Sequence, residues 1–141
     1  MIIELQVPVY PTESAEKVED CLLHLFPTMS TTTEKVNGSW MVYAESRDLK
    51  SIEWMKTRIR EIQIIDAVRR RLLSNWNGSE TSVLLDKQAA CSNRFRLLDD
   101  TEESPPLGSI QLVFTFENEI EFQNTMKWLV PPTKDGRVVK S

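Results

Sequence analysis

Apolar side chains recur with helical spacing through residues 48–78, the longest helical pattern in the chain. In its first half, Ile52, Met55, Ile59 and Ile62 follow one another at steps of three and four residues. Such steps place side chains on one face of an α-helix, where they can pack on a core. The first half therefore predicts an amphipathic helix.

The second half of this segment has its own apolar stripe, formed by Ile65, Val68, Leu72 and Trp76. At about 100° of rotation per residue, the centre of this stripe is displaced by roughly 90° from that of the first. A straight helix cannot bury both stripes against one flat surface. We therefore expect two helices, or one helix with a break near residues 61–63.

Alternating apolar and polar positions predict strands in the rest of the chain. Asn37 and Gly38 separate two such runs and suit the positive φ angles of a tight hairpin turn. We expect strands at residues 2–9, 31–36, 39–45, 81–86, 93–98 and 109–116, helices at 12–25 and 117–130, and a short connection at 87–91. Hairpins mixed with segregated helices indicate an α+β two-layer sandwich, with helices packed on one face of a mainly antiparallel sheet.

The length of 141 residues fits one domain. We expect this α+β domain to span residues 1–132, with an acidic, proline-rich loop at 99–108 and a loose tail at 133–141. No apolar run is long enough for a membrane span and no basic leader precedes one, so we expect a cytoplasmic protein. Cys21 and Cys91 lie far apart without a C-x-x-C arrangement, and in a reducing compartment we expect buried thiols.

Charge is distributed unevenly, although the net charge is only −4. Residues 47–96 contain eleven Lys and Arg against six Asp and Glu, a balance of +5, and the remainder balances at −9. A basic middle with acidic flanks can indicate a surface for a polyanion, or simply solvated helix surfaces.

The basic residues of this middle segment are the strongest candidates for a binding site. Guanidinium groups pair with phosphates and stack on RNA bases. The alternative is that they pair with neighbouring carboxylates and are structural. The RNA-binding candidates are Arg58, Arg60, Arg70, Arg71, Lys87, Gln88, Arg94 and Arg96.

The sequence contains none of the common catalytic motifs of an enzyme. The sequence has no nucleophile-elbow motif and no phosphate-binding glycine loop, and His24 is the only histidine. One histidine and two distant cysteines do not make a zinc site. The carboxylates of residues 99–103 could hold a divalent ion, although a solvated acidic turn explains them as well. We therefore expect a non-enzymatic protein with no catalytic residue, metal or cofactor.

Several motifs, in order, resemble one archaeal protein family. They are V-P-V-x-P-T-E at 7–13, L-F-P at 25–27, R-E-x-x-I-x-D-A-x-R-x-x-L at 60–72, L-x-K-Q-A-A at 85–90, SPPLGSI at 104–110 and W-L-x-P-x-T-K-D-G at 128–136. Together they resemble the uncharacterised protein family UPF0201, which is described as RNA-binding. The resemblance implies a fold similar to the L-five type large-subunit ribosomal protein, and it implies no established activity.

The leading hypothesis is a non-enzymatic RNA-binding protein that uses the basic helix-and-strand face. A dimeric protein-interaction module with structural arginines is the alternative, and a carboxylate-metal enzyme is a third. We also expect a homodimer, since four tryptophans and the strand at 31–36 offer apolar surface and a sheet edge.

Overall fold

Strands and helices follow the predicted order closely in the first two thirds of the chain. A computed structural model describes residues 1–99, 108–134 and 137–138. The elements are β1 (Ile2–Val9), α1 (Ala15–Leu25), β2 (Ser30–Val36), β3 (Ser39–Ser46), a 3-10 turn η1 (Leu49–Ile52), α2 (Glu53–Glu61), α3 (Ile65–Ser74), β4 (Glu80–Asp86), α4 (Lys87–Cys91), β5 (Ser109–Thr115), α5 (Glu119–Leu129), β6 (Thr133–Lys134) and β7 (Arg137–Val138).

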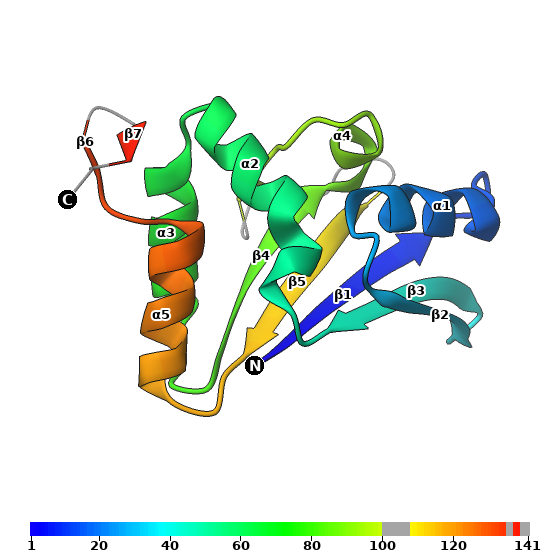
Figure 1. The fold of residues 1–141 in the computed structure, drawn as a ribbon. Helices are drawn as coiled ribbons and strands as arrows, with labels where there is room; N and C mark the ends of the chain where they lie inside the picture. The colour runs from blue at the N-terminus through cyan, green and yellow to red at the C-terminus, as the bar shows by residue number, and fades with distance from the viewer. Residues whose placement is uncertain (100–107, 135–136, 139–141) are drawn as a thin grey trace.

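Five strands form one antiparallel sheet in the order β2-β3-β1-β5-β4. Leu5 in the central strand β1 lies opposite Ala44 of β3 on one side and Leu112 of β5 on the other. The helices lie on one face of this sheet, as Figure 1 shows. The predicted α+β class, with helices packed on one face of a mainly antiparallel sheet, is confirmed.

The two faces of the sheet differ in character because strand residues alternate between them. The face toward the helices is apolar; it includes Ile3, Leu5 and Val7, which are fully buried. The opposite face is polar, and its charged side chains within the five described strands include Glu4 and Glu45 but no Lys or Arg. We call this surface the open face.

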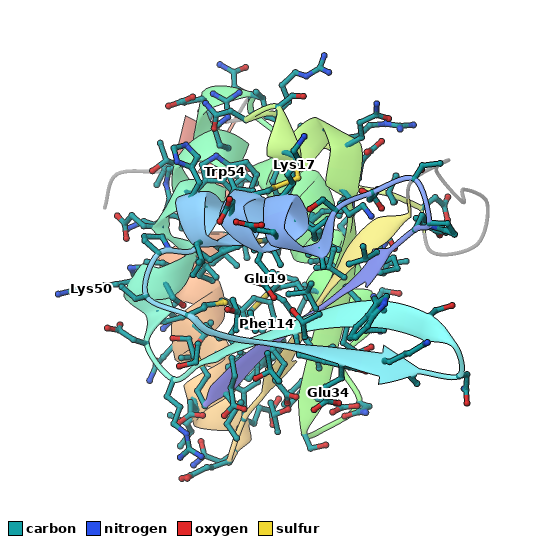
Figure 2. The ribbon with its side chains drawn as sticks, turned by 90° about the vertical axis from the view of Figure 1, so that its right-hand side faces the viewer. Lys17, Glu19, Glu34, Lys50, Trp54 and Phe114 are labelled. Carbon is teal, nitrogen blue, oxygen red and sulfur yellow. A yellow bond between two sulfur atoms is a disulfide. The ribbon has the colours of Figure 1, made fainter. Side chains whose placement is uncertain are left out.

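The hairpin of β2 and β3 turns at Asn37 and Gly38, as predicted, with φ angles of 51° and 84°. Helix α1 lies across this hairpin, and Figure 2 shows Glu19 between them and Glu34 on the far side of the hairpin. The Thr33 hydroxyl donates a hydrogen bond to the Glu19 carboxylate. This bond ties α1 to the outer strand of the sheet.

The predicted helix break is confirmed. Helix α2 ends at Glu61, and Gln63 adopts a left-handed conformation with a φ of 59° before α3 begins at Ile65. The Ile64 N–H donates to the Ile59 carbonyl at 3.0 Å across the break. The re-aimed chain lets Met55 and Ile59 of α2, and also the stripe of α3, face the core.

Helices α3 and α5 pack together at one end of the sheet, on the left of Figure 1. The Trp76 ring, just after α3, stacks on Phe122 of α5 with centroids 4.0 Å apart and also contacts Phe116 edge-on. The Arg69 side chain donates to the carbonyls of Val130 and Pro131, where α5 ends. Apolar and polar contacts together hold this end of the fold.

Two predictions near α4 are wrong. Residues 87–91 form a helical turn, α4, instead of a plain connection, because the Asp86 side chain caps it by accepting from the Ala89 N–H at 3.1 Å. Residues 93–98 are not a strand; only Leu97 makes an isolated bridge, to Leu85. Of the predicted acidic loop at 99–108, residues 100–107 lie outside the described residues, and the segment expected as a tail includes the β6–β7 pair.

Candidate nucleic-acid interface

A hollow of about 470 Å³ lies beside α4 and the segment that follows it. Three of the predicted site residues, Gln88, Arg94 and Arg96, line it together with Asp86 and Phe95. Gln88, Arg94 and Arg96 are exposed, whereas Phe95 is buried and anchors the segment between the two arginines. We call Gln88, Arg94 and Arg96 the α4 surface.

The two arginines of the α4 surface differ in their contacts within the described residues. Arg96 Nη1 lies 2.7 Å from Asp86 Oδ2, although half of the Arg96 side chain (52%) remains exposed. Arg94 has no side-chain hydrogen bond or ion pair with any residue of the described ranges. Arg94 is therefore available to an anion from solution.

Asp86 couples α4 to Arg96. Burial raises the pKa of this carboxyl, but the Ala89 N–H and the Arg96 guanidinium outweigh that effect and hold the pKa below its usual range. The carboxylate thus stays charged at neutral pH and fixes both the helix start and the arginine. Among the described residues that line the hollow, one carboxylate stands against two arginines.

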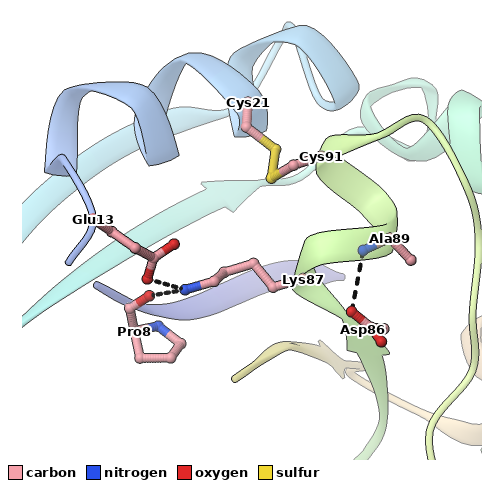
Figure 3. Close-up of a disulfide and its surroundings, with 7 residues drawn as sticks. All are labelled: Pro8, Glu13, Cys21, Asp86, Lys87, Ala89 and Cys91. Carbon is pink, nitrogen blue, oxygen red and sulfur yellow. Dashed lines mark hydrogen bonds and ion pairs between the residues drawn. A yellow bond between two sulfur atoms is a disulfide. The ribbon is translucent and has the colours of Figure 1, made fainter. Parts of the chain in front are cut away.

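Lys87, another of the RNA-binding candidates, is buried in the structure. Its side chain is 2% exposed, and Nζ donates to the Pro8 carbonyl and the Glu13 carboxylate, both at 2.6 Å (Figure 3). Nζ also lies over the Tyr10 ring, 5.1 Å from its centroid. A buried ammonium with these partners is structural and cannot reach a phosphate in solution.

The arginines of α2 and α3 do not join the α4 surface. Arg60 donates to the carbonyls of Trp128 and Leu129, Arg71 donates to the Leu98 carbonyl, and Arg58 pairs with Glu61 at 2.7 Å. Burial lowers the pKa of Arg60. Arg70 is exposed on α3 but is not among the residues that line the hollow. The predicted helix-and-strand face is thus divided, and Arg58, Arg60 and Arg71 have structural contacts.

Sequence reasoning missed the pairing of the two cysteines. Cys21 of α1 and Cys91 of α4 form a disulfide, so the expectation of two thiols is wrong (Figure 3). The packing of α1 against α4 brings their Cα atoms to 5.5 Å, a proximity that a sequence separation of 70 residues does not reveal. Both cysteines line a second hollow, of about 710 Å³, between these helices.

Trp54 and Asn93 close the neighbouring side of this region. Trp54 Nε1 donates to Asn93 Oδ1 at 2.7 Å, and the Trp54 ring contacts Phe26 and Phe95. The Trp54 ring is thus partly buried against the core, with its indole N–H satisfied. Trp54 thereby supports the segment that carries Arg94 and Arg96. Because its ring already packs on Phe26 and Phe95, it is not open for an RNA base to stack on.

Comparison with known proteins decides the family. A sequence model described as RNA binding matches residues 2–116. A UPF0201 protein of Sulfurisphaera tokodaii is 33% identical over 134 residues, which are 95% of this chain and 90% of that protein. The chain belongs to the UPF0201 family. Another UPF0201 protein, from Thermococcus kodakarensis, is 32% identical over 95% of this chain and 92% of its own length.

Solved structures of UPF0201 proteins have the same fold. One from Methanococcus jannaschii superposes with a TM-score of 0.81 at 25% identity, covering 99% of this chain and 100% of its own. A second UPF0201 crystal structure gives a TM-score of 0.74 at 29% identity, with the same coverage. The family resemblance inferred from the motifs is confirmed, while the likeness to the L-five type ribosomal protein remains a prediction.

The part of this UPF0201 chain that the structure describes shows neither a metal-binding cluster nor a membrane-spanning helix. No group of three or more His, Cys, Asp or Glu side chains within the described residues could hold a metal ion. Most of the acidic candidates near residue 100 lie outside those residues. Among the helices that the structure describes, none has the length and apolar character required to cross a bilayer.

Proposed function

We propose that this UPF0201 protein binds RNA through the α4 surface. The observation that carries the proposal is the exposed Arg94, unpaired within the described residues, in the same hollow as Arg96 and Gln88. The RNA-binding description of the family model supports an RNA partner. The residue assignment rests on the geometry of the hollow.

Phosphate contacts would dominate such an interface. The Arg94 guanidinium offers several donors in a fixed plane and matches the oxygens of a phosphate. Arg96 pairs with Asp86 and keeps 52% of its side chain exposed, so a phosphate bound at Arg94 would lie in the same hollow as a second guanidinium. Gln88 adds a neutral amide that can donate to a phosphate or to a base edge.

The proposal is tested by comparing the RNA affinity of the unmodified protein with that of a variant that lacks one arginine. Arg94→Ala should weaken the binding of a labelled uridine oligomer and of an RNA hairpin by roughly tenfold, the equivalent of about 1.4 kcal/mol. The plot of log affinity against log salt should become shallower by about one unit, because one phosphate contact is lost. Fluorescence anisotropy at several salt concentrations measures both effects.

Arg47→Ala is the matched control. Arg47 is an exposed arginine directly after β3, near the start of β1, where Ile3 pairs with Ser46. Helix α4 lies near the other end of β1, because its first residue, Lys87, contacts the Pro8 carbonyl there. Removal of Arg47 takes away the same charge far from the α4 surface. Equal losses in the two variants would show non-specific attraction only, and an absence of binding at low salt would refute RNA binding.

A homodimer is a second candidate for which the hairpin gives an observation. Trp40 and Val36 are exposed near its tip, on opposite faces of the hairpin, and β2 is an outer strand of the sheet. Exposed apolar surface beside a sheet edge is a common site of self-association. Light scattering at tens of micromolar, a working range for modest affinities, should report a dimer, and Trp40→Ser should shift it toward monomer. A monomer in the unmodified protein would refute this candidate.

A further inference from the structure

The disulfide joins α1 to the helix that carries the α4 surface. Cys21 lies within α1 and is half-buried, whereas Cys91 is the last residue of α4 and is exposed. The two cysteines are 70 residues apart in sequence, and they line the same hollow of about 710 Å³. Solvent thiols can therefore approach the bond from the Cys91 side.

Helix α4 depends on its surroundings because five residues are too few for a stable isolated helix. Its first residue, Lys87, is fixed by Glu13 and the Pro8 carbonyl. Its last residue is fixed by the disulfide. The helix is thus held at both ends, once by an ion pair and once by a covalent bond.

The backbone of Arg94 is coupled directly to the disulfide-bonded end of α4. The Arg94 N–H donates to the Ala89 carbonyl at 2.9 Å, and the Asn93 N–H donates to the Ala90 carbonyl at 2.9 Å. These bonds wrap residues 92–94 around the helix end at Cys91. A change in the position of Cys91 therefore moves the turn from which Arg94 extends.

We propose that the Cys21–Cys91 disulfide is a reversible clamp that sets the affinity of the α4 surface for RNA; this inference rests on the proposed function. In the oxidised protein the clamp pre-orders the turn at Arg94, so binding does not have to order it. In the reduced protein the turn must become ordered when RNA binds, and this loss of conformational entropy lowers the affinity. Ordering one flexible side chain and its turn lowers affinity by roughly two- to tenfold.

The redox step is an ordinary thiol–disulfide exchange with a dithiol. A thiolate of the dithiol attacks Sγ of the exposed Cys91, a new S–S bond forms there, and the bond to Cys21 breaks. The Cys21 thiolate leaves with the electron pair and takes a proton from water. The second thiol of the dithiol then displaces Cys91, which becomes a thiol, while the dithiol is oxidised to its disulfide.

Hydrogen exchange tests the clamp without reference to RNA. Exchange should speed up in residues 88–96 on reduction with dithiothreitol, while β1 and β3 should keep their protection. Thiol alkylation and mass spectrometry confirm that both cysteines are reduced in folded protein. A bond that resists dithiothreitol under native conditions, or unchanged exchange at 88–96, would overturn the clamp.

RNA affinity tests the coupling. Anisotropy titrations of the uridine oligomer should show a roughly two- to tenfold weaker affinity after reduction. The double variant Cys21→Ser with Cys91→Ser should bind as the reduced protein does, and dithiothreitol should not change it. Equal affinity of the oxidised and reduced proteins would overturn the coupling. Absence of binding in both forms would refute the proposed function and with it the coupling, whereas the exchange data would still decide the clamp.

Discussion

Lys87 and Glu13 form an ion pair between the start of α4 and the segment before α1, with Nζ and Oε1 separated by 2.6 Å. Both side chains are largely removed from water, with 2% and 16% of their surface exposed. The same Glu13 oxygen accepts from the Tyr10 N–H at 2.9 Å. This one carboxylate therefore organises both the turn before α1 and the buried lysine.

Lys87→Ala is expected to lower the free energy of unfolding by about 3 kcal/mol, because removing one partner leaves a buried, uncompensated carboxylate. Urea unfolding followed by circular dichroism measures the loss. Arg70→Ala, a change at an exposed arginine, should alter stability by less than about 0.5 kcal/mol. A Lys87→Ala variant as stable as Arg70→Ala would contradict the structural role of Lys87.

Reduction of the disulfide is expected to lower the free energy of unfolding by about 4 kcal/mol, since a loop closed between residues 70 apart restricts the unfolded chain strongly. Urea unfolding with and without dithiothreitol measures this difference. The serine double variant should match the reduced protein and should not respond to the reagent. A loss below about 1 kcal/mol would mean that the native state gains little from the bond.

Asp86→Asn is expected to change how stability depends on pH. The folded-state pKa of Asp86 lies below its ordinary value, so the ionised carboxylate stabilises the fold above about pH 4. That contribution is lost as the pH falls through the folded-state pKa. Asn can still cap α4, so the variant should lose about 1 kcal/mol at neutral pH and approach the original protein in acid.

Unfolding curves measured between neutral pH and pH 3 (a range of about four units, which spans ordinary carboxyl pKa values) check this dependence. Thr32→Ala, which removes no titratable group from an exposed position of β2, is the control and should leave the pH profile parallel to that of the original protein. A constant difference between Asp86→Asn and the original protein at every pH would contradict the shifted pKa.

Gln63→Gly is expected to raise the free energy of unfolding by about 0.5 kcal/mol, because glycine adopts the observed positive φ without a Cβ clash. Gln63→Val should lower it by about 1 kcal/mol, since a β-branched residue is strained in this conformation. Thermal unfolding of the two variants compares them directly. Two changes of the same sign would contradict a left-handed residue at the break.

The fold was largely predictable from the sequence because its signals are local. The displaced apolar stripes located the break between α2 and α3, and Asn37 with Gly38 located the hairpin. The short α4 was not predicted because Asp86, the residue that caps it, is also the last residue of the alternating pattern of β4, and that pattern assigns it to the strand alone. Residues 93–98 alternate like a strand, yet they have only one bridge to β4, so periodicity alone was misleading there.

The candidate site was predictable only in part, because exposure depends on contacts between distant segments. Sequence could not show that Lys87 reaches Glu13 and Pro8, or that Arg60 reaches the carbonyls at the end of α5. Gln88, Arg94 and Arg96 were found because they are close in sequence and the loop keeps them together. The disulfide depends on the packing of α1 on α4, which no residue spacing encodes.

The open face of the sheet collects negative charge. Glu4, Glu34, Glu45 and Glu80 lie on that side of the described strands, and by the same alternation so does Asp86, the partner of Arg96. A polyanion would be repelled from most of this face, so one that reaches Arg94 and Arg96 would have to approach along the sheet edge where β4 leads into α4.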